Sequence, residues 1–138
     1  MSAGYSGTPL IRKLGFKPGF RVHVSGAPES YWYDLGPLPE EVTCLKRLSS
    51  NLDLIHFFSA DRTQLENALP KFYGKLVDNG MVWVSWPKKA SKVPTTITED
   101  VIREVALPMG FVDVKVCAVD SVWSGLKLVI RKALRGNR

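Results

Sequence analysis

Two uninterrupted apolar runs with an amphipathic segment between them place the strongest limit on how this chain can fold. Residues 53–59 (DLIHFFS) and 81–86 (MVWVSW) are almost wholly apolar, as is typical of strands that are covered on both faces of a sheet. Between them, residues 60–77 repeat apolar side chains at helical spacing, which predicts a helix. Its apolar positions are Leu65, Ala68, Leu69, Phe72, Tyr73, Leu76 and Val77. Together the segments predict a strand–helix–strand unit with parallel strands.

The predicted helix contains a proline and is followed by a turn sequence. Pro70 has no backbone N–H, and its ring clashes with the preceding turn, so we expect a kink or a late helix start. Asn79-Gly80 has the residues that adopt the left-handed conformation after a helix, so we expect the helix to stop there.

Before this unit, the sequence predicts a short helix and two strands. Thr8-Pro9 has the residues that are favoured at a helix start, and Gly15 is expected to end that helix. Residues 20–24 (FRVHV) and 42–45 (VTCL) are predicted strands.

After the unit, Thr98 is expected to cap a helix that Gly110 closes. Residues 111–119 and 126–131 are predicted strands, and they lie too close in sequence for a crossover helix, so we expect them to pair antiparallel. In the first of these strands the residues expected on one face are Val112, Val114, Val116 and Ala118. The fold class is therefore α/β: a single three-layer domain over residues 1–138, with a mostly parallel sheet of about six strands that ends in an antiparallel hairpin.

Composition bounds the class of protein. The chain has 138 residues, of which 45% are hydrophobic and 23% charged, as is usual for one globular core. No apolar run reaches the roughly 20 residues of a membrane span, and residues 2–6 are polar, so we expect no membrane segment and no signal peptide. Cys44 and Cys117 lie in strand-like apolar runs, which predicts two buried thiols in a reducing cytoplasm, with a disulfide as the alternative.

Basic side chains concentrate at the two ends of the sequence. Residues 1–21 hold four basic and no acidic side chains, residues 127–138 hold five basic and none acidic, and the formal net charge is +6. We interpret these ends as solvated termini, because nucleic-acid binding needs basic side chains gathered on one folded face. Nucleic acid is therefore disfavoured as a partner, and an electrostatic arm for RNA, DNA or an acidic partner is the alternative.

Ligands in a sheet of this kind bind beyond the carboxyl ends of the parallel strands. Lys88, Lys89 and Lys92 follow one strand and lead toward the helix start at Thr98, so they predict an anion site in which Trp86 could stack on a ring. The alternative is a solvated loop whose tryptophan packs on the core. The candidate ligand-binding residues are Gly26, Ala27, Arg47, Ser85, Trp86, Lys88 and Lys89.

The sequence contains none of the common catalytic or metal-binding signatures. Its two histidines, His23 and His56, fall in predicted strands, where a histidine is more often packed or hydrogen-bonded than catalytic. We therefore predict no catalytic residue and no metal ligand. Residues 31–33 (YWY) cannot all face inward on one regular element, so some are expected at the surface, where they could support a homodimer.

Three stretches resemble a small bacterial family known as a domain of unknown function: KPGFRVHVSGAP, the segment from DLIHFFS to WPKKAS, and VDVKVCAVDSVWSGLK. The order of elements also resembles the Rossmann-like sheet of S-adenosylmethionine-dependent methyltransferases. That resemblance implies a glycine-rich loop after the first strand and an acid after the second. Here residues 25–28 (SGAP) hold one glycine, and Lys46-Arg47 follows the second strand, at what we expect to be the same sheet edge as Lys88. We therefore predict weak or no S-adenosylmethionine binding and no cofactor.

These observations favour a noncatalytic binding module for an anionic small molecule or a protein partner at the strand carboxyl ends. One alternative is a small transferase, a degenerate methyltransferase-like enzyme with a nucleotide-type ligand between Gly26 and Trp86. The other is a nucleic-acid-associated protein that uses the basic ends of the chain.

Overall fold

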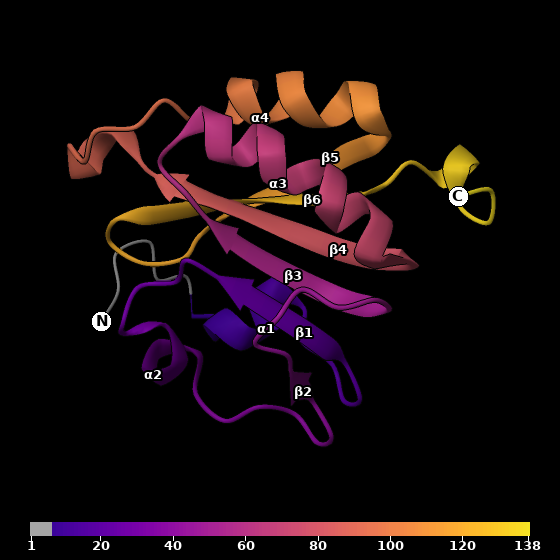
Figure 1. Cartoon of the computed structure of the whole chain (residues 1–138). Coiled ribbons are helices and arrows are strands. Elements are labelled where there is room, and N and C mark those ends of the chain that lie inside the picture. Colours follow the sequence, from indigo (N-terminus) through magenta and orange to yellow (C-terminus); the bar gives the residue numbers. More distant parts are fainter. Residues whose placement is uncertain (1–6) are drawn as a thin grey trace.

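The computed structural model describes residues 7–138, in which short helices and strands alternate until a closing pair of strands (Figure 1). The strands are β1 (Arg21–Ser25), β2 (Thr43–Cys44), β3 (Leu52–Phe58), β4 (Leu76–Pro87), β5 (Phe111–Ala118) and β6 (Trp123–Ile130). The helices are α1 (Leu10–Leu14), α2 (Tyr31–Leu35), α3 (Arg62–Lys75) and α4 (Glu99–Ala106). Single 3-10 turns are η1 (Lys89–Ser91), η2 (Leu107–Met109) and η3 (Lys132–Leu134).

The strands form one six-stranded sheet in the order β2-β1-β3-β4-β6-β5. β1 pairs in parallel with both β2 and β3, and β3 pairs in parallel with β4. β6 is antiparallel to β4 on one side and to β5 on the other. The α/β class, the six strands and the closing antiparallel hairpin are therefore confirmed.

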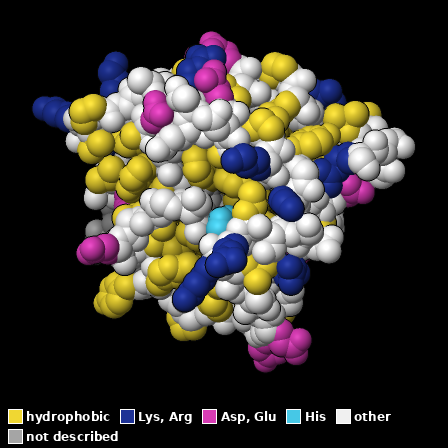
Figure 2. Space-filling view, viewed as in Figure 1, with side chains coloured by type: hydrophobic (Ala, Val, Ile, Leu, Met, Phe, Trp, Pro, Cys, Tyr) yellow, Lys and Arg dark blue, Asp and Glu magenta, His cyan; other side chains and the backbone are white. Residues whose placement is uncertain are grey.

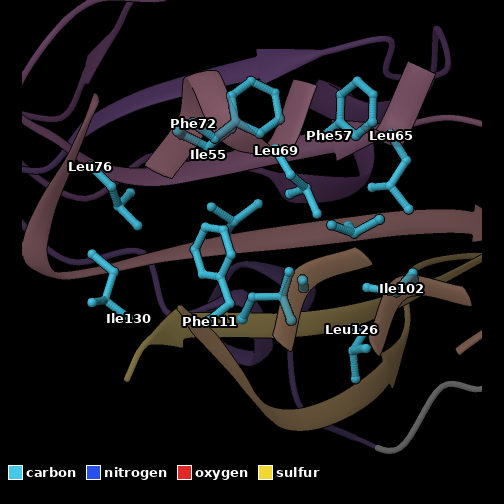
Figure 3. Close-up of a cluster of buried hydrophobic side chains, with 14 of the residues drawn as sticks. Ile55, Phe57, Leu65, Leu69, Phe72, Leu76, Ile102, Phe111, Leu126 and Ile130 are labelled. Carbon is cyan, nitrogen blue, oxygen red and sulfur yellow. The ribbon is translucent and has the colours of Figure 1, made fainter. Parts of the chain in front are cut away.

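Helices cover both faces of this sheet. α3 and α4 lie on one face, above the sheet in Figure 1, and α1 and α2 lie on the other. β3 and β4 alternate between the two cores, so that Ile55 and Val82 face α3 while Leu54 and Trp83 face α1 and α2. Figure 3 shows the first core, where side chains of α3 and α4 converge on β3, β4 and the closing hairpin. The central strands are mostly apolar because both of their faces are covered.

The end of α3 differs from the prediction. The helix runs without interruption through Pro70 and passes at Leu76 directly into β4, and Asn79-Gly80 does not adopt a left-handed turn. Instead, residues 77–80 interrupt the regular pairing of β3 with β4. Leu52 lies opposite Leu76 and Leu54 lies opposite Met81, so β4 has extra residues between these two pairs. Gly80 is needed there for space, because a Cβ on it would come within 2.7 Å of the Leu76 side chain.

The expected apolar face of β5 is also wrong. The pairing with β6 shifts register between Asp113 and Lys115, which inserts one extra residue and reverses the alternation of side chains. Val112, Val114 and Val116 are exposed and do not share a face.

The prediction of two buried thiols requires a correction. Cys44 is exposed, because β2 has only two residues and lies at the edge of the sheet, and Cys117 is half-buried. The two cysteines are not joined in a disulfide. Across residues 7–138, every helix falls short of the length and apolar character that crossing a membrane requires.

Candidate functional site

The order of the strands reverses at β1, whose neighbours β2 and β3 lie on opposite sides. In parallel sheets, the carboxyl ends at such a reversal flank the usual ligand crevice. Gly26 and Ala27, both predicted site residues, directly follow β1 at this point. Gly26 has φ +74°, and a Cβ on it would lie 2.6 Å from the backbone oxygen of Phe58. The loop after β1 is thus held close against the end of β3.

Aromatic side chains pack around Phe58, at the end of β3 next to this reversal point. The Phe58 ring stacks on His56 with centroids 4.2 Å apart, and Tyr31 and Trp123 meet Phe58 edge-on at 5.4 and 5.2 Å. His56, Tyr31 and Phe58 are buried. Beside these rings, a separate hollow of about 390 Å³ remains at β1 and β2, lined by Val24, Trp32, Cys44, Leu45 and Lys46.

A chain of buried hydrogen bonds crosses this cluster. The Tyr31 hydroxyl lies 2.9 Å from Nδ1 of His56, and Nε2 of His56 lies 2.7 Å from the Ser85 hydroxyl. Burial lowers the pKa of His56 to about 3, so the ring is neutral and donates one of these bonds while it accepts the other. Ser85 and His56 have no exposed surface, so the chain joins α2, β3 and β4 out of reach of a substrate.

The sequence does not predict that Tyr31, His56 and Ser85 contact one another. His56 and Ser85 are the polar interruptions in two apolar strands, which was a usable signal that each needs a buried partner. Tyr31 is buried as the inner member of the YWY segment, while Trp32 and Tyr33 are 45% and 89% exposed, so the expectation that not all three face inward is confirmed.

The other histidine is also hydrogen-bonded. Nδ1 of His23 lies 2.8 Å from the Leu45 carbonyl oxygen. Figure 2 shows a small patch of histidine at the surface with Lys and Arg side chains around it. His23 is 8% exposed, whereas His56 has no exposed surface. Both histidines are thus packed and hydrogen-bonded, as expected.

The buried neutral ring of His56 makes the stability of the protein sensitive to acid. Folded His56 takes up a proton near pH 3 and an unfolded histidine near pH 6.5, so below pH 6.5 the unfolded chain binds more protons. The free energy of unfolding should fall by roughly 1.4 kcal/mol for each pH unit below the unfolded value. Urea unfolding between about pH 5 and pH 7 measures this slope. An equal slope in His56→Gln would contradict the assignment.

A hollow of about 500 Å³ lies between the end of β4 and the start of α4. We call it the β4–α4 hollow, and its principal lining residues are Trp86, Lys89, Lys92, Thr95, Thr98 and Glu99. The loop that borders it is anchored to the closing hairpin, because the backbone N–H of Lys88 donates to the Val122 carbonyl at 2.8 Å. The sequence predicts that these lysines and Trp86 share one site, but no sequence pattern marks Thr95 as a residue of that site.

The charge balance of the hollow is positive. Glu99 is the acid on its wall, and its carboxylate accepts from the Arg103 guanidinium at 2.7 Å. Thr98 caps α4 by accepting from the backbone N–H of Val101 at 3.2 Å. The ammonium groups of Lys89 and Lys92 have no acid paired with them among residues 7–138. The arrangement suits an anion.

The other predicted site residues do not meet in this hollow. Ser85 lies in the buried chain, and Gly26 and Ala27 lie at the reversal point. Arg47 belongs to residues 45–51, which return to the amino end of β1, where the Arg21 guanidinium donates to the carbonyls of Ser50 and Asn51. Lys46 lines a separate hollow with Val24 and Trp32, so it shares no hollow with Lys89 and Lys92.

No group of three His, Cys, Asp or Glu side chains between residues 7 and 138 is placed to hold a metal ion. The basic C-terminal segment is partly tied to the body, since Arg138 bonds Asp78 and the guanidinium of Arg131 donates to the Leu107 carbonyl.

The family described as "Protein of unknown function (DUF3052)" matches residues 49–132. A comparison with curated proteins finds no match. Among solved structures, a SAM-dependent methyltransferase from Aquifex aeolicus is 15% identical, with 88% of this chain and 87% of that chain covered and a TM-score of 0.65. A putative type 11 methyltransferase from Sulfolobus solfataricus is 16% identical, with 81% and 85% covered and a TM-score of 0.57. At these identities the likeness shows a methyltransferase-like, Rossmann-like fold and nothing further.

A fold of this kind implies S-adenosylmethionine, and the residues present do not fit it. A Cβ on Gly26 would lie 2.6 Å from the backbone oxygen of Phe58, and residues 25–28 hold a single glycine, so the loop after β1 lacks the glycine-rich backbone that lets a cofactor approach closely. No acid follows β2, where Leu45 and Lys46 stand instead, so no carboxylate is placed there to accept hydrogen bonds from ribose hydroxyls.

Proposed function

The chain belongs to the DUF3052 family of proteins of unknown function, and from that premise we propose that it is a noncatalytic binding module for an anionic small molecule. The observation that carries the proposal is the β4–α4 hollow, which combines two lysines with a helix start at the carboxyl end of a central strand. Its volume of about 500 Å³ is within the usual range of small-molecule sites. The exposed and half-buried thiols, free of a disulfide, support a cytoplasmic location.

The hollow has three features that recognise an anion. Lys89 and Lys92 supply positive charge, and the pairing of Glu99 with Arg103 removes the main opposing charge. Backbone N–H groups in the first turn of α4 add donors and a favourable dipole. Trp86 gives an apolar wall on which a ring could rest.

The absence of catalysis is inferred from how the reactive side chains are used. Ser85 and His56 bond each other within the core, and the ring of His23 is held by the Leu45 carbonyl. The methyltransferase-like fold supports a second candidate, a degenerate transferase with a nucleotide-type ligand near Gly26. The single glycine in the loop after β1 and the lack of a carboxylate directly after β2 favour the first candidate.

A thermal-shift panel of inorganic phosphate, pyrophosphate and nucleoside monophosphates tests the proposal. At a hundredfold excess over its dissociation constant, a ligand should raise the free energy of unfolding by about 2.7 kcal/mol. Lys89→Ala and Lys92→Ala should each weaken binding roughly five- to tenfold, because each removes one charged contact. Lys71→Ala removes the same charge from the exposed surface of α3 and should leave affinity unchanged.

Two results would decide against this proposal. Binding that is equally strong in Lys89→Ala, Lys92→Ala and Lys71→Ala would place the ligand elsewhere. Binding of S-adenosylmethionine with a dissociation constant below about 50 µM by calorimetry would favour the transferase candidate instead.

A further inference from the structure

The guanidinium of Arg138 lies in a pocket at the end of α3. Its Nε donates to the Asp78 carboxylate at 2.8 Å, and its two terminal nitrogens donate to the backbone carbonyls of Tyr73 and Leu76. The guanidinium carbon lies 5.0 Å from the centre of the Tyr73 ring, within the range of a cation–π contact. We call Tyr73, Leu76 and Asp78 the guanidinium pocket.

Each part of the guanidinium pocket suits a guanidinium. The last carbonyls of a helix have no partner within the helix and carry partial negative charge, so they favour a cation. Asp78 adds a full charge, and the bond from Arg138 lowers the pKa of this carboxyl, which keeps it ionised. A planar group with donors along its edges reaches a carboxylate and two carbonyls at once, and an ammonium group does not match that geometry. The pocket therefore favours arginine over lysine.

The segment that carries Arg138 is held to the body by little apolar surface. Among residues 131–138, Leu134 is the one residue that is not exposed, and it packs at the edge of the core beneath α3 and α4. Segments with few buried apolar contacts open locally at a low free-energy cost. The side chain of Arg138 is nevertheless only 16% exposed, so its polar contacts are a main attachment of this segment.

A hollow of about 780 Å³ adjoins the guanidinium pocket. The end of α3 and the start of β4 line it on one side, and Leu134, Asn137 and Arg138 line it on the other. Figure 1 shows the yellow end of the chain on the side where β4 begins, whereas the β4–α4 hollow follows the other end of β4, and the two hollows share no lining residue. The adjoining hollow leaves room for the residues that flank an arginine in a peptide.

We propose that the guanidinium pocket binds an arginine in a peptide segment of a partner protein, and that Arg138 occupies the pocket as an internal competitor. The seated segment of this chain shows the form of the ligand. The backbone N–H of Gly136, two residues before the arginine, donates to the same Asp78 carboxylate at 2.9 Å. This second bond comes from a peptide group, so it favours a peptide over free arginine. The proposal does not depend on the anion site in the β4–α4 hollow.

Fluorescence anisotropy with a labelled, amidated peptide KALRGNR, which repeats residues 132–138, tests this proposal. The peptide should bind Arg138→Ala roughly tenfold more tightly than wild type, because Arg138 leaves the pocket open in only a fraction of wild-type molecules. Adding Asp78→Asn to Arg138→Ala should weaken binding roughly tenfold, since it removes the charge of the pocket. A peptide with lysine in place of its last arginine should bind Arg138→Ala more weakly by a similar factor.

Lys132→Ala is the matched control, because it removes one positive charge from the same segment without lining the hollow, and it should bind the peptide as weakly as wild type. The urea midpoints of Arg138→Ala with and without Asp78→Asn should agree closely, which separates lost binding from lost folding. The proposal would be overturned by absence of binding to Arg138→Ala, by equal binding to wild type, by no loss on Asp78→Asn, or by equal binding of the lysine peptide. Equally tight binding of N-acetylarginine amide would assign the pocket to free arginine instead. Dimerisation of wild type that Arg138→Ala abolishes would assign it to a second copy of this chain.

Discussion

Replacing His56 with alanine should lower the free energy of unfolding by about 3–5 kcal/mol, which is a large part of the stability of a domain this size. Removal of the ring leaves a cavity among Tyr31, Phe58 and the sheet. It also leaves the hydroxyls of Tyr31 and Ser85 without the partners they have at 2.9 and 2.7 Å. Equilibrium urea unfolding above pH 7 measures the loss without any contribution from histidine protonation.

His23→Ala is the matched control, because it removes the same side chain from a neighbouring strand. His23 makes one hydrogen bond, to the Leu45 carbonyl, at the edge of the core. Its loss should therefore lower the free energy of unfolding by only about 1–2 kcal/mol. Tyr31→Phe, which keeps the ring and removes the hydroxyl, should fall in the same range. If His56→Ala were no more destabilising than His23→Ala, the buried chain would not join α2 to the sheet as described.

The apolar patterns of the sequence predict the main helix and the central strands. The places where the structure departs from these predictions are explained by pairing between strands. The apolar spacing of residues 60–77 located α3, and the continuous apolar runs located β3 and β4. Asn79-Gly80 has turn chemistry, but pairing of Leu76 with Leu52 extends β4 back to the end of the helix. Local propensity was overridden by a contact between residues far apart in sequence, which a pattern along the chain does not contain.

Contacts between residues far apart in sequence also limit how much of the site can be predicted. Trp86 and Lys89 line one hollow, as the sequence predicts, because a position after a buried strand is at the carboxyl edge in any parallel sheet. Arg47 as a ligand-binding residue stays a prediction, since the sequence does not show that β2 has only two residues and that Arg47 lies in the segment leading to β3. The hydrogen bond from Lys13 to the Ala118 carbonyl depends on where α1 packs on the sheet, and the spacing of apolar residues does not predict that position.

Gly26→Ala should lower the free energy of unfolding by about 2–4 kcal/mol, from two sources. The φ of +74° is unfavourable for alanine, and the new Cβ would lie 2.6 Å from the backbone oxygen of Phe58. That oxygen belongs to the end of β3, so relief of the clash must separate the loop from the strand at the point where Ser25 pairs with Phe57. The midpoint of urea unfolding measures the change.

Gly19→Ala separates these two sources. Gly19 has a similar φ of +79° and no atom within 4 Å of its added Cβ, so the substitution brings the backbone strain without a clash. It should lower the free energy of unfolding by about 1–2 kcal/mol, and the excess at Gly26 measures how tightly the loop is held against β3. Equal losses at the two glycines would mean that the Gly26 loop can move away from Phe58 at little cost. The Gly26 loop could then make room for a ligand beside β1, and the argument against S-adenosylmethionine from that tight loop would fail.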